Sequence, residues 1–72
     1  MKITTWNVNG YRAIISKNFY DSVSYLDTDV LCLQEIKAKV EQVAESQRLI
    51  DGYESVWNSA ERPGYSGVAA YF

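Results

Sequence analysis

The sequence contains no histidine and only one cysteine among its 72 residues. Without histidine, the chain by itself cannot supply a histidine metal ligand, a Ser-His catalytic pair or a histidine general base. The single cysteine, Cys32, cannot form an intrachain disulfide. A free thiol within an apolar run is typical of a small buried side chain in a reducing compartment, so we expect a cytoplasmic location.

Long apolar runs and a positive net charge are also lacking. No stretch of about 18 apolar residues is present, so the sequence predicts no transmembrane helix and no membrane partner. The net charge is −2, which argues against a protein that binds nucleic acid through overall charge alone. An enzyme that binds phosphate through a few local cations is not excluded. The 47% of hydrophobic residues is typical of a folded domain rather than of a disordered chain.

The hydrophobic pattern predicts strands that alternate with helices. The four expected strands cover 3–8, 30–35, 53–58 and 66–72. The two expected helices cover 11–26, with a break near 17–18, and 40–47, with Gly52 as the residue that follows the second helix. The apolar run at 30–33 is typical of a strand buried on both faces. The order β-α-β-α-β-β predicts an α/β fold with parallel first strands, and a hairpin joins the last two around a turn at 61–64.

The sequence ends at Tyr71-Phe72, inside the last expected strand. A strand that ends in this way would expose unpaired backbone groups and aromatic surface. We therefore expect residues 1–72 to be the N-terminal portion of a longer domain.

Two polar side chains are expected where the first two strands end. Asn7 lies at the end of the first strand and Glu35 at the end of the second. A β-α-β crossover brings both ends to the same edge of the sheet, which is where α/β proteins build sites. Amide and carboxylate oxygens suit Mg²⁺ better than Zn²⁺. Polar residues at strand ends are more often turn formers or caps, so this pair alone leaves both interpretations open.

Strand alternation makes this hypothesis specific. It places Ile3, Thr5 and Asn7 on one face of the first strand, and Leu31, Leu33 and Glu35 on one face of the second. We expect the apolar members of both sets to fill the core. The oxygens of Asn7 and Glu35 should then lie about 4–6 Å apart, close enough to share a cation.

Three strings in the sequence are more informative than the pattern. They are Trp-Asn-Val-Asn-Gly-Tyr-Arg-Ala at 6–13, Asp-Val-Leu-Cys-Leu-Gln-Glu-Ile-Lys at 29–37 and Gly-Tyr-Ser-Gly-Val-Ala at 64–69. Their order and spacing resemble the opening of the exonuclease III type of AP endonucleases, in the endonuclease/exonuclease/phosphatase superfamily. The resemblance implies that the chain is the N-terminal part of a four-layer α/β/β/α sandwich.

The resemblance also implies a role for individual residues. Glu35 would be the carboxylate ligand of a catalytic Mg²⁺, with Mn²⁺ as a possible substitute, and Asn7 would lie beside it as a further catalytic residue and ligand. Lys37 would support the acidic metal site. The residues expected to contact DNA or lie next to the metal are Asn9, Arg12, Lys17 and Tyr65. Without the family, Arg12 and Lys17 would be read as solvated cations and Tyr65 as a half-buried strand residue.

The function implied is a Mg²⁺-dependent AP endonuclease with 3′→5′ exonuclease activity, acting as a monomer on double-stranded DNA with abasic sites. The family's Asp-x-Asn pair, catalytic tyrosine and Asp-His pair would all follow residue 72, so we expect the 72 residues alone to be inactive. One alternative is a non-catalytic relative of the catabolite repression control type, which binds RNA-protein assemblies. Another is a small α/β interaction protein that stands alone.

Overall fold

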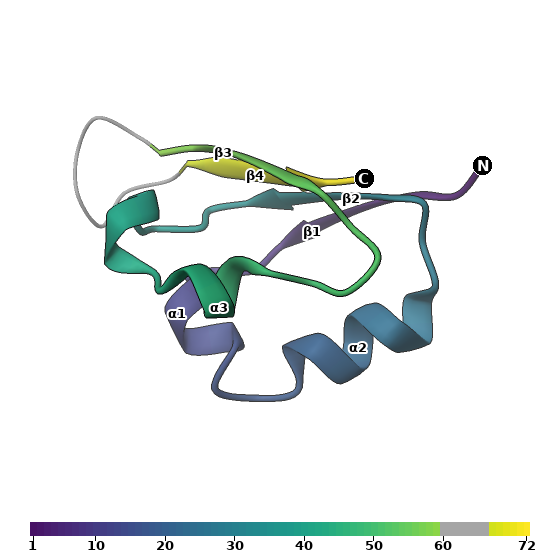
Figure 1. The fold of residues 1–72 in the computed structure, drawn as a ribbon, viewed down its shortest axis with the longest axis horizontal. Helices are drawn as coiled ribbons and strands as arrows, with labels where there is room; N and C mark the ends of the chain where they lie inside the picture. The colour runs from purple at the N-terminus through teal and green to yellow at the C-terminus, as the bar shows by residue number, and fades with distance from the viewer. Residues whose placement is uncertain (60–66) are drawn as a thin grey trace.

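The fold follows the predicted order of strands and helices. The computed structural model describes residues 1–59 and 67–72. The elements are β1 (Ile3–Asn7), α1 (Tyr11–Ile14), α2 (Phe19–Leu26), β2 (Val30–Gln34), the 3-10 helix η1 (Val40–Gln42), α3 (Glu45–Arg48), β3 (Ser55–Asn58) and β4 (Val68–Tyr71). The four strands form one mixed sheet in the order β1-β2-β4-β3, which confirms the α/β class (Figure 1).

The strand pairing also agrees with the prediction. β1 and β2 are parallel neighbours, with Thr4 opposite Leu31 and Trp6 opposite Leu33. β4 lies antiparallel to both β2 and β3, so β3 and β4 are the expected antiparallel partners. Because α1 and α2 connect two parallel strands, they must cross one face of the sheet, and the carboxyl ends of β1 and β2 meet at one edge.

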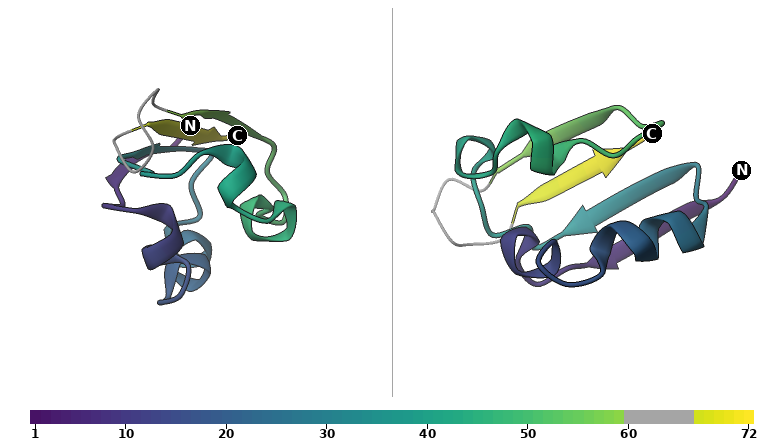
Figure 2. Two further views of the ribbon diagram at one scale, coloured as in Figure 1. Left: turned by 90° about the vertical axis from the view of Figure 1, so that its left-hand side faces the viewer. Right: turned by 60° about the horizontal axis from the view of Figure 1, so that its bottom comes forward.

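All helices lie against the same face of the sheet, as Figure 2 shows from two directions. Leu31 and Leu33 of β2 are buried on this face, as predicted. They belong to one core that also contains Tyr11, Phe19, Val23, Ile36, Val43, Ala69 and Tyr71. Trp6 stacks on Phe19 with ring centroids 5.4 Å apart, and this contact fixes α2 against β1.

The opposite face carries no helix in the part of the chain that the structure describes. Thr5, Cys32, Ala70 and Val56 form one row across it, and Val56 is 60% exposed. The expectation that Ile3 fills the core is wrong, because its exposed fraction is 62%. The parallel register turns Thr4 and Trp6, rather than Ile3 and Thr5, toward the helices. The expected burial of 30–33 on both faces is also not seen, since Cys32 is only partly buried.

The helical segments are shorter than the pattern predicted. The break near 17–18 is confirmed, because α1 ends at Ile14 and α2 begins at Phe19. The second helix is divided, because Val43 has an extended backbone. Gly52 does not cap it as predicted: Leu49 is extended and ends α3, while Gly52 lies in a later turn.

Within 1–59 and 67–72, no helix has the length and apolar character needed to cross a membrane. The predicted turn at 61–64, the start of the last expected strand and the predicted DNA contact Tyr65 lie outside the described residues.

Candidate active site

The candidate site lies at the shared edge where β1 and β2 end. Backbone hydrogen bonds continue the pairing past both strands: the amide of Val8 donates to Gln34 O at 3.1 Å, and that of Gly10 donates to Glu35 O at 2.8 Å. Tyr11 N then donates to Ile36 O at 2.8 Å. The two loops are therefore held together by main-chain hydrogen bonds, which fix the backbone positions from which their side chains extend.

Three residues of these loops have left-handed backbones. The φ angles are 48° at Asn9, 54° at Glu35 and 52° at Lys37. This conformation costs a non-glycine residue roughly 1 kcal/mol and is common at functional sites. Ile36, between the last two, is fully buried and anchors the loop in the core. The alternation points Glu35 and Lys37 away from the core while Ile36 points into it.

Asn7 and Glu35 meet at this edge, as the sequence predicted. The side-chain amide of Asn7 donates from Nδ2 to Glu35 Oε2. The backbone amide of Asn9 donates to Asn7 Oδ1 at 3.1 Å, so the oxygen of that amide is turned toward Asn9. The Asn7 side chain thus presents an N–H group to the carboxylate and holds one of its oxygens in place.

Lys37 contacts the same group from the other side. Its ammonium donates to Asn9 Oδ1 at 2.5 Å and lies 3.8 Å from Glu35 Oε1. The side chains of Lys37 and Glu35 are 38% and 42% exposed, so solvent and ions can reach both. The four residues 7, 9, 35 and 37 form a connected polar cluster, which we call the Glu35 cluster.

A hollow of about 530 Å³ adjoins the Glu35 cluster. It is lined by Gly10, Arg12, Ala13 and Lys37, so two cations border this open space, and one of them, Lys37, belongs to the cluster. Such a space suits an anion, because guanidinium and ammonium groups both bind phosphate oxygens. Lys17 is exposed beyond α1 and does not line this hollow.

A tyrosine network that the sequence did not reveal connects α1, α2 and β4 to α3. Tyr11 is fully buried, and its hydroxyl donates to Gln47 O at 2.6 Å and lies 3.4 Å from Tyr71 Oη. Tyr20 donates to the same carbonyl, and Tyr71 donates to Arg48 O, each at 2.6 Å. The position of Tyr11 directly after Gly10 did not reveal the network, because its partners, the carbonyl of Gln47 and the hydroxyl of Tyr71, are 36 and 60 residues away.

Burial determines the ionisation of this network. Burial, followed by the hydrogen bond and charge of Tyr71, raises the pKa of Tyr11 far above the usual value. Burial also raises the pKa of Tyr71, although its hydrogen bond with Tyr11 acts in the opposite direction. Both hydroxyls are therefore protonated at neutral pH and serve as structural donors rather than as proton acceptors.

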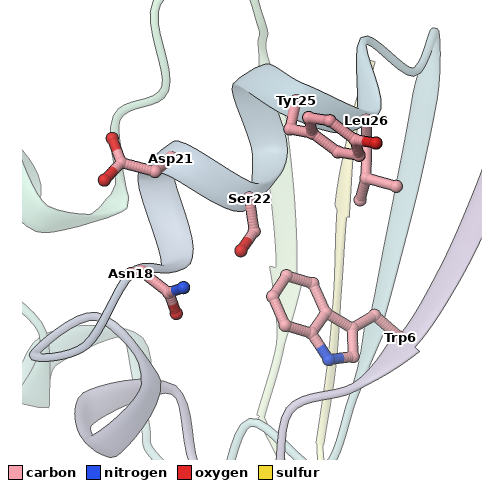
Figure 3. A pocket seen from close by; sticks show the side chains of 6 residues that line it. All are labelled: Trp6, Asn18, Asp21, Ser22, Tyr25 and Leu26. Carbon is pink, nitrogen blue, oxygen red and sulfur yellow. The ribbon is translucent and has the colours of Figure 1, made fainter.

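A larger hollow lies away from the Glu35 cluster, between β1 and α2. Its volume is about 550 Å³, and its lining consists of Trp6, Asn18, Asp21, Ser22, Tyr25 and Leu26. Figure 3 shows the indole of Trp6 across the hollow from Ser22 and Leu26, whereas Asp21 points away from the indole. Since these lining residues include neither Lys nor Arg, the hollow lacks the cations that a phosphate would need.

The chain's own donor set for a metal is small. Among residues 1–59 and 67–72, no three His, Cys, Asp or Glu side chains come together. Glu35 offers one accessible carboxylate, and its Oε1 does not accept the Asn7 amide. This hard, partly exposed oxygen suits Mg²⁺, which keeps several waters and takes one or two carboxylates.

Known proteins match this chain over almost its full length. The sequence profile of the endonuclease/exonuclease/phosphatase family matches residues 4–72. The chain belongs to this family. Within the family it is similar to the DNA-(apurinic or apyrimidinic site) endonuclease 2 of Xenopus laevis, at 40% identity over 72 residues, and to the exodeoxyribonuclease of Bacillus subtilis, at 43% over 74. The resemblance to the exonuclease III type is therefore confirmed.

A solved structure extends the likeness to the fold. The AP endonuclease LMAP from Leishmania major is 37% identical, with a TM-score of 0.81, over 99% of this chain and 23% of that one. The two curated relatives are matched over 99% of this chain but only 14% and 27% of their own lengths. The chain thus spans about a quarter or less of these family members, whose names identify them as phosphodiester hydrolases.

Proposed function

We propose that the full-length protein in which this chain occurs is a divalent-metal-dependent DNA repair nuclease that cleaves phosphodiesters at abasic sites and removes nucleotides from 3′ ends. The observation that carries the proposal is the Glu35 cluster, in which a positioned carboxylate lies beside Lys37, one of the two cations that line the neighbouring hollow. Membership of a family whose relatives include AP endonucleases and an exodeoxyribonuclease supports it.

In this proposal Glu35 is the metal ligand. A bound Mg²⁺, or Mn²⁺ in its place, would stabilise the charge that develops on phosphate oxygens during cleavage. Asn7 holds Oε2 of the carboxylate through its amide, while Oε1 lies 3.8 Å from the Lys37 ammonium. Asn7 is both a candidate ligand through Oδ1 and a positioning group through Nδ2. The donation from Asn9 to Oδ1 makes the positioning role the one this arrangement favours.

The DNA backbone would approach from the side of the cationic hollow. Arg12 and Lys37 line it and can bind a phosphate despite the net charge of −2. Lys17 is exposed further along the chain and would contact a neighbouring phosphate. Asn9 accepts a hydrogen bond from Lys37 and would influence DNA binding by positioning that side chain. The proposed DNA contact of Tyr65 rests on the sequence alone.

We further propose that residues 1–72 are the N-terminal portion of a longer catalytic domain, active as a cytoplasmic monomer. One carboxylate with one amide is a small part of a phosphodiesterase site, and the matched relatives are several times longer. The remaining acid-base groups would come from outside these residues.

The test is an incision assay with the full-length protein on duplex DNA that contains one abasic site. We expect Mg²⁺-dependent cleavage on the 5′ side of that site, which leaves a 3′-hydroxyl, and no cleavage of an otherwise identical intact duplex. Absence of metal-dependent cleavage under these conditions would contradict the proposal. If the protein instead bound an RNA-protein assembly without cleaving nucleic acid, the non-catalytic alternative would be correct.

A further inference from the structure

The ammonium of Lys37 lies beside the Glu35 oxygen that a metal would bind. A cation bound to this oxygen would be repelled by the positive charge of Lys37. The ammonium is 3.8 Å from Glu35 Oε1, and Asn7 donates to Oε2 of the same carboxylate. Within residues 1–59 and 67–72, the other partner of this ammonium is Asn9 Oδ1, at 2.5 Å. Lys37 therefore acts as a counter-charge for the oxygen that is left free for a metal.

We propose that Lys37 is a tethered cation that screens Glu35 until a divalent metal displaces it toward the phosphate hollow, so that metal binding delivers a second cation to the DNA backbone. The proposal rests on the assignment of Glu35 as a metal ligand. A supporting role for Lys37 would strengthen metal binding. In this proposal Lys37 weakens it, because the ammonium competes with the metal for Glu35.

Charge and reach both favour this exchange. A divalent ion on Oε1 would repel an ammonium about 4 Å away, and the flexible lysine side chain can relieve the repulsion by rotating. The hollow that Lys37 already lines, with Gly10, Arg12 and Ala13, has a volume of about 530 Å³ and offers it an open place. There its charge would add to that of Arg12, which is unfavourable until a phosphate binds between them.

The exchange predicts that metal binding and DNA binding are coupled. If metal binding releases Lys37 to the phosphate, then DNA binding must strengthen metal binding by the same factor. Lys17, a cation of the same sequence region that does not line the hollow, should show no such coupling.

Direct titration of the full-length protein with Mn²⁺ tests whether Lys37 competes with the metal for Glu35. We expect Lys37→Met to bind Mn²⁺ about three- to tenfold more tightly than wild type, since one nearby positive charge is removed. Lys37→Arg, which keeps the charge, should remain close to wild type. Unchanged or weaker binding by Lys37→Met would overturn the inference, provided that Glu35→Gln loses Mn²⁺ binding. If Glu35→Gln binds Mn²⁺ like wild type, the assignment of Glu35 fails first, and the inference falls with it.

The affinity for DNA tests whether metal binding releases Lys37 to the phosphate. The probe is a duplex that has no abasic site and whose ends are closed by hairpin loops. We expect Mg²⁺ to raise the affinity of wild type for this probe several-fold more than that of Lys37→Met. Lys17→Met should weaken binding equally with and without Mg²⁺. An equal gain from Mg²⁺ in wild type and Lys37→Met would overturn the release of Lys37 to phosphate.

Discussion

At the scale of single residues, the site depends on groups that hold other groups. Glu35 has one oxygen fixed by Asn7 and the other near Lys37, while Asn9 contacts both of these neighbours. None of these contacts lies deep in the core, so each is weak by itself. Asn7 and Asn9 give the carboxylate one orientation before any ligand arrives, which lowers the cost of binding, whereas Lys37 is the contact that the proposed metal would displace.

The buried tyrosine hydroxyls predict how stability depends on pH. The folded-state pKa values of Tyr11 and Tyr71 are raised, so the folded protein retains protons that the unfolded chain loses above about pH 10. Stability is therefore fully present below pH 10 and should fall as pH rises further, by up to about 1.4 kcal/mol per pH unit for each tyrosine. We expect Tyr11→Phe to flatten this fall.

The measurement is urea unfolding of the full-length protein at several pH values between 8 and 11, with Tyr25→Phe as the control. Tyr25 is 89% exposed, so its removal should leave the pH dependence unchanged. A fall in stability that is equally steep in Tyr11→Phe and wild type would show that other groups cause it.

At the scale of elements, the loop between β1 and α1 is the part that most directly supports the site. Gly10 has φ 102° and ψ 107°, a conformation that L side chains rarely adopt, and its amide donates to Glu35 O. An added Cβ would meet Ala13 Cβ at 3.9 Å, which is ordinary contact. The penalty for a side chain at this position is therefore conformational rather than steric.

Gly10→Ala should lower stability by about 1–3 kcal/mol and should also lower the incision rate, because the strained loop carries Asn9 and contacts Glu35 O. Gly52→Ala is the matched control: Gly52 has φ 87° with nothing within 4 Å of an added Cβ, and its turn lies outside the site. It should lower stability but leave the incision rate of the folded protein unchanged. Equal effects of the two variants on the rate would refute the role of the Gly10 loop.

The elements also indicate what a sequence can predict. That Asn7 and Glu35 lie at one edge of the sheet was predictable, since it follows from a parallel β-α-β unit. The predicted shared face was wrong, because Asn7 lies opposite Gln34 rather than in register with Leu33. The exposure of Ile3 was not, because alternation defines two faces of a strand without saying which one the helices cover. The left-handed backbone of Glu35 was not predictable either, since nothing in the residue type favours it.

Longer-range features were harder still to predict. Gly52 followed an amphipathic stretch and resembled a helix cap, but the extended backbones of Val43 and Leu49 end the helices earlier. The hydroxyl of Tyr11 reaches a backbone carbonyl 36 residues away, at Gln47. Such contacts depend on the complete packing and leave no periodic signal in the sequence.

At the scale of the whole molecule, one face of the sheet is covered by helices and the other carries exposed apolar side chains. Ile3, Val56 and Val68 are 62%, 60% and 47% exposed on strands of this sheet. Exposed apolar area of this kind favours association and lowers the stability of a monomer. A chain of 72 residues buries only about 60% of the surface of its unfolded state, so its core is small for a domain.

We therefore expect the 72-residue chain, expressed alone, to be a weakly stable or self-associating species without nuclease activity. Thermal unfolding monitored by circular dichroism, with sedimentation to determine mass, would measure the first property, and the abasic-site assay the second. A monomer that unfolds in one sharp transition, or one that incises abasic DNA at the rate of the full-length protein, would contradict this expectation.

The central claim is that Glu35 binds the divalent metal used in phosphodiester cleavage. The most direct test compares single-turnover incision of abasic DNA by full-length wild type, Glu35→Gln and the control Glu41→Gln, whose side chain is exposed on η1. We predict that Glu35→Gln slows incision at least about hundredfold, since a metal contributes several kcal/mol to the transition state, with stability changed by less than about 0.5 kcal/mol. Glu41→Gln should match wild type. An incision rate for Glu35→Gln within about threefold of wild type, with the same Mg²⁺ dependence, would contradict the claim.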